Sequence, residues 1–249
     1  SMEHPPKDHG EEGLEPYPRA YPELSPTPFG KRPPLERMLD GADLVIAHEW
    51  NDHDLVPAIG TQRKRGGRFT LLFHDTHHRA VSEPKAMKAY DLSGYDGVLA
   101  FGETLAEVYR RWGWGDRVFV WHEAADIRHF HPIPPRDGEE DQPKAGGGGP
   151  SPEERQGLVW IGNWGEGERT RELKEYLFRP AKEAGLGLDI YGVRYHETAK
   201  ATVRRHGGRY HGWLANAEAP SVFAPHLATV HLPRRYYTKM LPRIPATPH

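Results

Sequence analysis

The sequence contains no cysteine among its 249 residues. This absence excludes disulfide bonds, thiolate nucleophiles and cysteine-based zinc sites. Long apolar runs are missing as well, since no stretch approaches the roughly 20 apolar residues that a membrane-spanning helix needs. The N-terminus also lacks the basic and then apolar layout of a secretion signal. We therefore expect a cytoplasmic protein without a transmembrane segment.

An excess of charge of one sign is absent too. The chain has 33 basic and 35 acidic residues, which gives a formal net charge of -2. This balance produces no long-range field that would attract nucleic acid or an anionic membrane. We therefore expect a small-molecule ligand and no nucleic-acid partner.

Proline and glycine divide the chain into four predicted parts. Residues 1–34 contain nine prolines and few aliphatic residues, which predicts a proline-rich tail. Apolar runs and amphipathic stretches then alternate over 35–131, and again over 157–249. Between them, residues 132–156 carry charge, proline and a run of four glycines, which is typical of a flexible linker.

The alternation of strand and helix patterns predicts the fold class. In each of the two larger parts, short apolar runs are separated by helical periodicity, which favours a parallel sheet with right-handed crossovers. We therefore predict an α/β protein with two Rossmann-like parallel-sheet domains. Each domain looks incomplete, because no apolar strand precedes Leu35 and no closing helices follow the last strand. The predicted strands cover 43–47, 69–73, 97–101, 117–121, 158–161, 188–191, 209–211 and 228–232.

Histidines and carboxylates follow each predicted strand of the first domain. Parallel strands end at one edge of the sheet, and ligands bind beyond that edge. Imidazole or carboxylate groups there can exchange protons near neutral pH. The alternative is that they are the polar residues that begin helices in any α/β protein. These residues are His48, Glu49, His74, Asp75, His78, Glu103, His122 and Glu123, and Arg79 follows the second strand beside them.

Glycine turns follow the strands of the second domain. Gly162, Asn163 and Trp164 come directly after a strand and before a helix, where backbone N–H groups can meet a phosphate. The turn is neither a P-loop nor a dinucleotide fingerprint. Arg169 in the first helical turn opposes the helix dipole unless it faces an anion, and the alternative is a solvated surface arginine.

Two further strand ends carry glycine. Gly192 and then Arg194 follow the next strand, where glycine permits close approach and arginine can bind a phosphate. Gly212 follows the third strand and precedes Trp213, whose indole either stacks on a base or belongs to the core.

Metal binding is the competing interpretation of the histidines. His74, His77 and His78 are ligands by type, yet their spacing matches no standard zinc pattern, and a His-Glu-x-x-His helix is absent. A histidine-dependent metal hydrolase therefore stays open as a second alternative.

The order of these motifs resembles the GT-B glycosyltransferases. The segment 122–132 is similar to the passage that joins their two domains, with Asp126, Phe130 and Pro132 in the matching places. The strands with glycine turns at 158–162, 190–192 and 210–212 resemble the first three of their nucleotide-binding domain. An Ala-Asp-Leu-Val strand and the Asp75-Thr76 pair resemble the bacterial spore-maturation-type glycosyltransferases.

This resemblance implies transfer of a sugar from a nucleotide-sugar donor to an unknown acceptor (a glycan, a protein or a small molecule) in an interdomain cleft. His74 would stand beside the transferred sugar, and His74, Asp75 and Glu49 are the predicted catalytic residues. No metal or other cofactor is expected, because helix N-termini and basic side chains offset the leaving diphosphate. The predicted donor-binding residues are Gly162, Asn163, Trp164, Arg169, Gly192, Arg194 and Gly212.

The chain also departs from the family pattern. Glu168-Arg169 replaces a usual Lys-Gly pair, and the Phe-Glu-Ala-Leu-Ala-x-Gly helix that holds the donor ribose does not follow residues 241–245. The sequence therefore resembles a family member truncated at both ends. A non-catalytic relic that binds a nucleotide sugar or a glycan is the first alternative.

Overall fold

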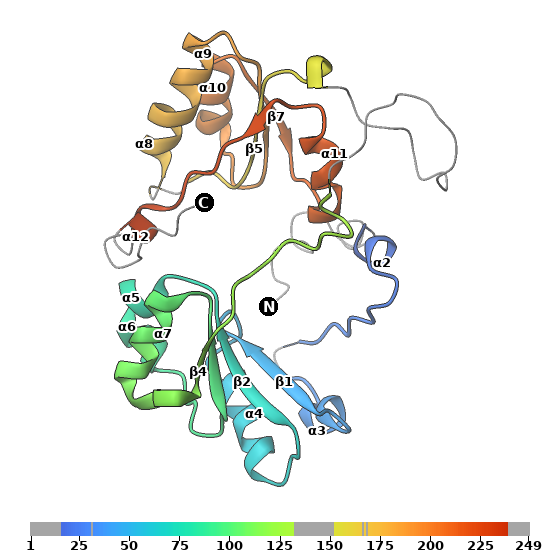
Figure 1. Ribbon diagram of the computed structural model, residues 1–249, viewed down its shortest axis with the longest axis vertical. Coiled ribbons are helices and arrows are strands. Elements are labelled where there is room, and N and C mark those ends of the chain that lie inside the picture. The colour runs from blue at the N-terminus through green and yellow to red at the C-terminus, as the bar shows by residue number, and fades with distance from the viewer. Residues whose placement is uncertain (1–15, 31, 132–151, 166, 168, 239–249) are drawn as a thin grey trace. The chain divides into compact units, whose positions relative to one another are not determined.

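The computed structural model describes residues 16–30, 32–131, 152–165, 167 and 169–238. The chain divides into two compact units (Figure 1). Among the described residues, unit 1 holds 26–30, 32–124 and 236–238, and unit 2 holds the remainder. Residues 132–151, which form most of the predicted linker, lie outside the described residues, as do 1–15 of the predicted tail and 239–249.

Part of the proline-rich segment predicted to be a tail is helical. The helix α2 (Pro16–Ala20) places Pro16 and Pro18 in its first turn, where a missing N–H removes no helical hydrogen bond. It packs beside the short 3-10 helix η6 (Asn216–Glu218) of unit 2. Proline density alone therefore did not exclude a regular element here.

Unit 1 is built on a four-stranded parallel sheet. Its strands pair in the order β1-β2-β3-β4, so each strand lies beside the one before it in the chain. The bounds are β1 (Leu44–His48), β2 (Thr70–Asp75), β3 (Gly97–Ala100) and β4 (Val118–Val120). The helices are α3 (Leu35–Leu39), α4 (Leu55–Lys64), α5 (Arg79–Ser82), α6 (Pro84–Lys88), α7 (Glu103–Tyr109), η2 (Arg110–Trp114) and η3 (Gly115–Arg117).

The two faces of this sheet differ in burial. Leu71, Phe73 and Asp75 alternate along β2 and are buried, and the apolar ones join a core with residues of α4 and α7 such as Val56 and Leu105. On the opposite face, Leu44 and Phe119 are 54% and 52% exposed. The helices therefore bury one face of the described sheet more completely than the other.

Unit 2 has a parallel sheet with a different strand order. Its strands pair as β7-β6-β5-β8, so the chain moves outward from β5 to β7 and returns to the other side of β5 with β8. Such a reversal is a topological switch point, the position at which open α/β sheets form a crevice. The bounds are β5 (Leu158–Ile161), β6 (Leu188–Tyr191), β7 (Gly208–Gly212) and β8 (Ala228–Thr229).

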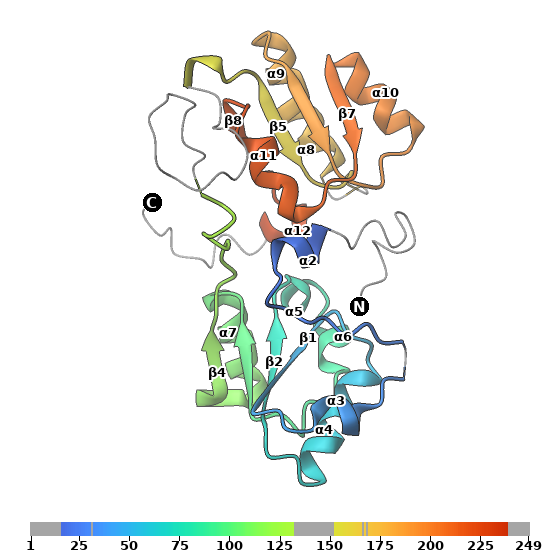
Figure 2. The same cartoon turned by 90° about the vertical axis from the view of Figure 1, so that its right-hand side faces the viewer.

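Helices pack on both faces of the unit 2 sheet, with α8, α9 and α10 on one face and α11 on the other (Figures 1 and 2). Both units thus have the predicted α/β class with parallel sheets. The elements of unit 2 other than strands are η4 (Pro152–Glu154), α8 (Thr170–Leu173), η5 (Lys174–Phe178), α9 (Arg179–Glu183), α10 (Glu197–Arg205) and α11 (Ala219–Phe223). The last described helix, α12 (Arg235–Thr238), begins at the final residue of unit 2, and its other three residues belong to unit 1.

The helical region between β5 and β6 forms as three consecutive segments, α8, η5 and α9. The middle one, η5, is a π-helical turn that ends just before α9, whose second residue is Pro180. Proline cannot donate to the preceding turn, and its ring clashes with the carbonyl group there, so the helix widens locally. Leu173, Leu177 and Ala181 recur every four residues and are buried in the core of unit 2.

Gly192 is required by close backbone packing at the end of β6. Its φ of +140° is rare for residues with a side chain, and a Cβ there would lie 2.3 Å from the carbonyl oxygen of Gly162. The backbones of the loops after β5 and β6 are therefore in close contact at Gly162 and Gly192. Gly212 has a φ of +88°, but nothing lies within 4 Å of its potential Cβ.

These two glycines provide a matched test of the close approach. We expect Gly192→Ala to lower the free energy of unfolding by about 3 kcal/mol, because the strain of a positive φ and the clash of the new Cβ with the Gly162 carbonyl oxygen both destabilise the fold. Gly212→Ala should lower the same free energy by only about 1 kcal/mol, because the positive φ is strained but the new Cβ meets no neighbouring atom. Urea unfolding followed by tryptophan fluorescence measures both values. Equal losses would show that the Gly162 contact contributes nothing.

Candidate functional site

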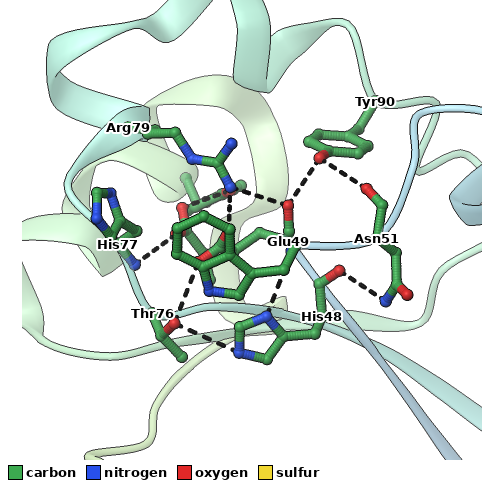
Figure 3. A network of polar contacts seen from close by, with 10 residues as sticks. His48, Glu49, Asn51, Thr76, His77, Arg79 and Tyr90 are labelled. Carbon is green, nitrogen blue, oxygen red and sulfur yellow. Dashed lines mark hydrogen bonds and ion pairs between the residues drawn. The ribbon is translucent and has the colours of Figure 1, made fainter. Parts of the chain in front are cut away.

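The loops that follow β1 and β2 meet around one buried carboxylate. Glu49 is fully buried, and its backbone N–H donates to the carbonyl oxygen of His74 at 3.0 Å. Arg79 forms an ion pair with the Glu49 carboxylate and donates to the Glu49 carbonyl oxygen at 3.0 Å. The Thr76 hydroxyl donates to Glu49 Oε1 at 3.1 Å (Figure 3). A single carboxylate thus ties two strand ends together.

The rest of this network fixes the loop backbone after β1. The Tyr90 hydroxyl donates to the Glu49 carbonyl oxygen at 2.7 Å. The Asn51 carbonyl oxygen is a second acceptor for the same hydroxyl, at 3.1 Å. The Asn51 side-chain amide donates to the His48 carbonyl oxygen at 2.9 Å. We call His48, Glu49, Asn51, Thr76, Arg79 and Tyr90 the Glu49 network (Figure 3). Burial raises the pKa of Glu49, and the positive charge of Arg79 opposes that rise.

Asp75 points away from this edge and into the helical core. It is fully buried, its Oδ2 accepts from the Tyr109 hydroxyl at 2.9 Å, and its Oδ1 accepts from the His77 backbone N–H at 3.0 Å. Burial raises the pKa of Asp75 to about 6. The two hydrogen bonds favour the ionised carboxylate, but they offset only part of the desolvation.

His74 lies on the opposite face of β2 because side chains alternate along a strand. Its ring meets the His48 ring edge to face at 5.1 Å and lies 5.1 Å from that of Trp121. The buried Nε2 of His74 has no hydrogen-bond partner within the described part of the chain. Burial lowers the pKa of His48 and of His74, and the charge of Glu123 partly offsets this. Both imidazoles are therefore neutral at pH 7 and can accept a proton.

The remaining strand-end residues of unit 1 divide into two groups. His78 is buried and its Nδ1 lies 2.7 Å from the Ser82 hydroxyl one turn further along α5. Glu103 pairs with Arg110 from the end of its own helix and takes no part in the Glu49 network. His122 and Glu123 are exposed beyond β4. Strand alternation thus separates His74 from Asp75, which the sequence alone had grouped together as catalytic.

In unit 2, protein groups hold the glycine turn after β5. The Gly162 N–H donates to the Tyr191 carbonyl oxygen at 2.9 Å, and the Gly162 carbonyl oxygen accepts from Trp160 Nε1 at 3.1 Å. Asn163 Oδ1 accepts from the Val193 N–H at 3.1 Å. These bonds fix the turn against the loop after β6.

Arg169 bridges the topological switch point. Its guanidinium donates to the carbonyl oxygen of Leu232 at 3.1 Å and to that of Asn163 at 3.4 Å. The same group lies 5.1 Å from the Trp160 ring centroid. The arginine predicted to meet a phosphate therefore binds backbone carbonyls that follow β5 and β8.

A cavity of about 560 Å³ lies between the loops after β5 and β6. Lys174, Arg194 and His196 line it, and no aspartate or glutamate belongs to its described lining. Arg194 has a φ of 67°, a left-handed conformation that is strained for a residue with a side chain and that clusters at functional sites. The full lining is Trp164, Gly167, Thr170, Lys174, Arg194, His196, Thr198 and Thr202.

Sequence reasoning identified only Trp164 and Arg194 among the side chains of this cavity. It missed Thr170 and Lys174, which lie four residues apart on the helix after β5. It also missed Thr198 and Thr202, which have the same spacing on α10. Residues four apart share a helix face, so a polar pair at this spacing on each helix was the available signal.

Two kinds of feature are absent from the described residues. No group of three or more histidine, aspartate or glutamate side chains in this part of the chain is placed to hold a metal ion. No helix among the same residues combines the length and apolar character needed to cross a membrane.

Comparison with known proteins yields distant likenesses of structure only. No protein-family model matches the sequence, and no curated protein does. One similar structure is an alpha-glucosyltransferase in complex with UDP and a 13-mer DNA containing a central A:G mismatch, at 12% identity and a TM-score of 0.41. The likeness covers 84% of this chain and 52% of that one, so this chain spans about half its length.

A second similar structure is MurG from Acinetobacter baumannii, at 13% identity and a TM-score of 0.28. It covers 74% of this chain and 69% of that one. At such identities a likeness concerns the fold alone, and the α/β assignment rests on the strand order of this chain. The resemblance to the spore-maturation type stays a prediction.

The buried position of Asp75 predicts its titration. The carboxyl should titrate near pH 6 in the folded protein, so the stability that its bound proton contributes is complete below about pH 3.8 and is lost as the pH rises through about 6. Tyr109→Phe removes a bond to the ionised form and should raise the pKa further. Carbon-13 NMR titration of the carboxyl measures both values.

Tyr90→Phe is the matched control for this titration, since the Tyr90 hydroxyl binds the Glu49 and Asn51 carbonyl oxygens and makes no bond to Asp75. It should leave the Asp75 titration near its original position. A wild-type midpoint below pH 4.5 would contradict the proposed effect of burial.

Proposed function

We propose that the chain is a glycosyltransferase that uses a nucleotide-sugar donor, and that the cavity between the β5 and β6 loops binds the donor diphosphate. The observation that supports this proposal is the charge of the cavity, which Lys174, Arg194 and His196 line without an acidic residue among the described lining. A diphosphate carries negative charge that such groups neutralise. Threonine hydroxyls on two helix faces supply further donors.

The other predicted donor residues act, in this proposal, by shaping the cavity. Gly162 and Gly192 bring the two loops together, and Asn163 fixes them through the Val193 N–H. Trp164 is buried against Phe178 and Tyr195 yet still lines the cavity. No metal is needed in this scheme, because the basic side chains stabilise the leaving diphosphate.

In unit 1 we propose that His74 accepts the proton of the acceptor hydroxyl. A neutral imidazole is required for that step, and burial lowers the pKa of His74. The Nε2 of His74 makes no hydrogen bond to a described residue, so the described part of the protein does not hold this ring nitrogen. Asp75 and Glu49, predicted as catalytic, would support this histidine by holding its strand end, since both carboxylates bind protein groups.

A second candidate is binding of a nucleotide sugar without turnover. The engagement of Arg169 favours it, because its guanidinium donates to the Leu232 and Asn163 carbonyl oxygens. Turnover distinguishes the two candidates, since both require the nucleotide to bind.

Calorimetric titration with UDP, GDP and their sugar conjugates tests the donor cavity. We expect one nucleotide to bind in the micromolar range, and Lys174→Ala and Arg194→Ala each to weaken it about tenfold, which corresponds to about 1.4 kcal/mol. Arg204→Ala removes an exposed positive charge from α10 outside the cavity and should leave affinity unchanged. If no nucleotide bound, or if Arg204→Ala weakened binding as much, the cavity assignment would fail.

His74→Ala tests the proposed base once a donor is identified. Transfer should fall by roughly 10² to 10⁴ in kcat, the usual contribution of a positioned general base, while nucleotide affinity stays the same. Wild-type kcat should decline at acidic pH, where His74 becomes protonated, with a midpoint below the ordinary 6.5. Asn51→Ala removes a hydrogen bond to the His48 carbonyl oxygen at the end of β1 without removing an imidazole, and it serves as the comparison. Undiminished transfer in His74→Ala would remove this histidine from the mechanism.

A further inference from the structure

Unit 1 contains a cavity of its own, on the helical side of its sheet. It has a volume of about 630 Å³ and is lined by residues of α6, of the loop that follows it, and of η2 and η3. We call it the α6–η2 pocket. Its lining differs from the Glu49 network, because Tyr90 is the one described residue that belongs to both. The pocket shares no residue with the proposed donor cavity of unit 2.

Three positive charges line the α6–η2 pocket. They belong to Lys88, Arg111 and Arg117, and no aspartate or glutamate is part of the described lining. Within the described part of the chain, none of the three makes an ion pair. The nearby carboxylate of Asp91 accepts from the Ser93 backbone N–H at 2.9 Å. The charge of the pocket is therefore uncompensated, which favours an anionic ligand.

Two tryptophans hold two of these charges in place. Lys88 Nζ lies 4.9 Å from the Trp112 ring centroid, and Arg117 Cζ lies 4.5 Å from that of Trp114. Trp112 in turn packs edge to face on the buried Tyr109 at 5.1 Å. Stacking restricts the long cationic side chains before a ligand arrives, which lowers the entropy lost on binding.

The turn that carries these indoles depends on glycine. Gly113 has a φ of 97° and Gly115 a φ of 54°, values that glycine adopts readily and other residues rarely. The alternation Trp-Gly-Trp-Gly over 112–115 thus turns the chain sharply while both indoles line one cavity. Leu92 adds a further apolar group to the same wall.

We propose that the α6–η2 pocket binds an anionic saccharide. Carboxylates of the sugar would pair with Lys88, Arg111 and Arg117, and the C–H faces of the rings would pack on the indole edges and Leu92. The volume lies in the range of organic-ligand sites and exceeds what a single inorganic anion fills. This binding site goes beyond the transferase proposal and does not depend on it, because direct binding requires neither donor nor turnover.

Titration calorimetry of the whole chain with tetragalacturonate tests the proposal. We expect saturable binding of one molecule that weakens as salt rises, because ion pairs contribute. The fully methyl-esterified tetrasaccharide keeps the rings and removes the charge, and it should bind at least tenfold more weakly. Inorganic phosphate should not displace the acid saccharide at equal concentration, since it lacks the apolar ring faces.

Two variants locate the binding within the molecule. Lys88→Met and Arg117→Met keep an apolar stem against the tryptophans and remove the charge, and each should weaken tetragalacturonate at least fivefold. Lys85→Met removes one exposed charge from the same helix outside the pocket and should leave binding unchanged. Circular dichroism establishes that each variant folds.

The outcomes that would overturn the proposal are distinct from one another. Absence of binding, or equal binding of the methyl ester, would remove the anionic saccharide as the ligand. An equal loss in Lys85→Met would show a general effect of charge. Displacement by inorganic phosphate would assign the pocket to a free anion, and tighter binding of an oligothymidylate would assign it to single-stranded nucleic acid.

Discussion

The ion pair between Glu49 and Arg79 is the interaction on which the carboxyl edge of unit 1 depends. A fully buried carboxylate loses several kcal/mol of hydration, so it must be held by a partner charge and hydrogen bonds. Arg79 and Thr76, which both follow β2, supply them to a residue that follows β1. The loops after the two strands therefore cannot move independently. That constraint fixes the backbone that carries His48 and His74, whose rings meet on the other side of the strand ends.

Unit 2 has a related arrangement, in which an arginine binds backbone carbonyl oxygens instead of a carboxylate. Arg169 spans the switch point and joins the segments after β5 and β8. In each unit an arginine near the start of a helix holds loops together. Other cations, Lys174 and Arg194 in unit 2, line a cavity instead. The cations that fix loops and those that line the cavity are therefore different residues, although all are basic side chains near strand ends or helix starts.

The sequence predicted strands better than it predicted side-chain contacts. The bounds of β5 and β6 match the predicted 158–161 and 188–191, because their apolar runs are short and flanked by glycine. The strand predicted over 228–232 forms only at Ala228–Thr229, and the short helices α5 and α6 were not predicted, since Pro84 interrupts their periodicity. Strand order, and therefore the switch point, cannot be read from periodicity. The cavity of unit 2 was missed because half of its side chains lie on helix faces rather than in loops.

Strand order explains why the two units place their cavities differently. The described sheet of unit 1 runs in one direction without a reversal, so no switch point opens a crevice there, and the α6–η2 pocket forms among the helices. Unit 2 has a reversal between β5 and β8, yet Arg169 occupies it and binds carbonyl oxygens on both sides. The cavity lies one strand away, between the loops that follow β5 and β6, which the contact between Gly162 and Gly192 keeps close. Topology sets where a crevice can form, and in unit 2 that position is bridged by the guanidinium of Arg169.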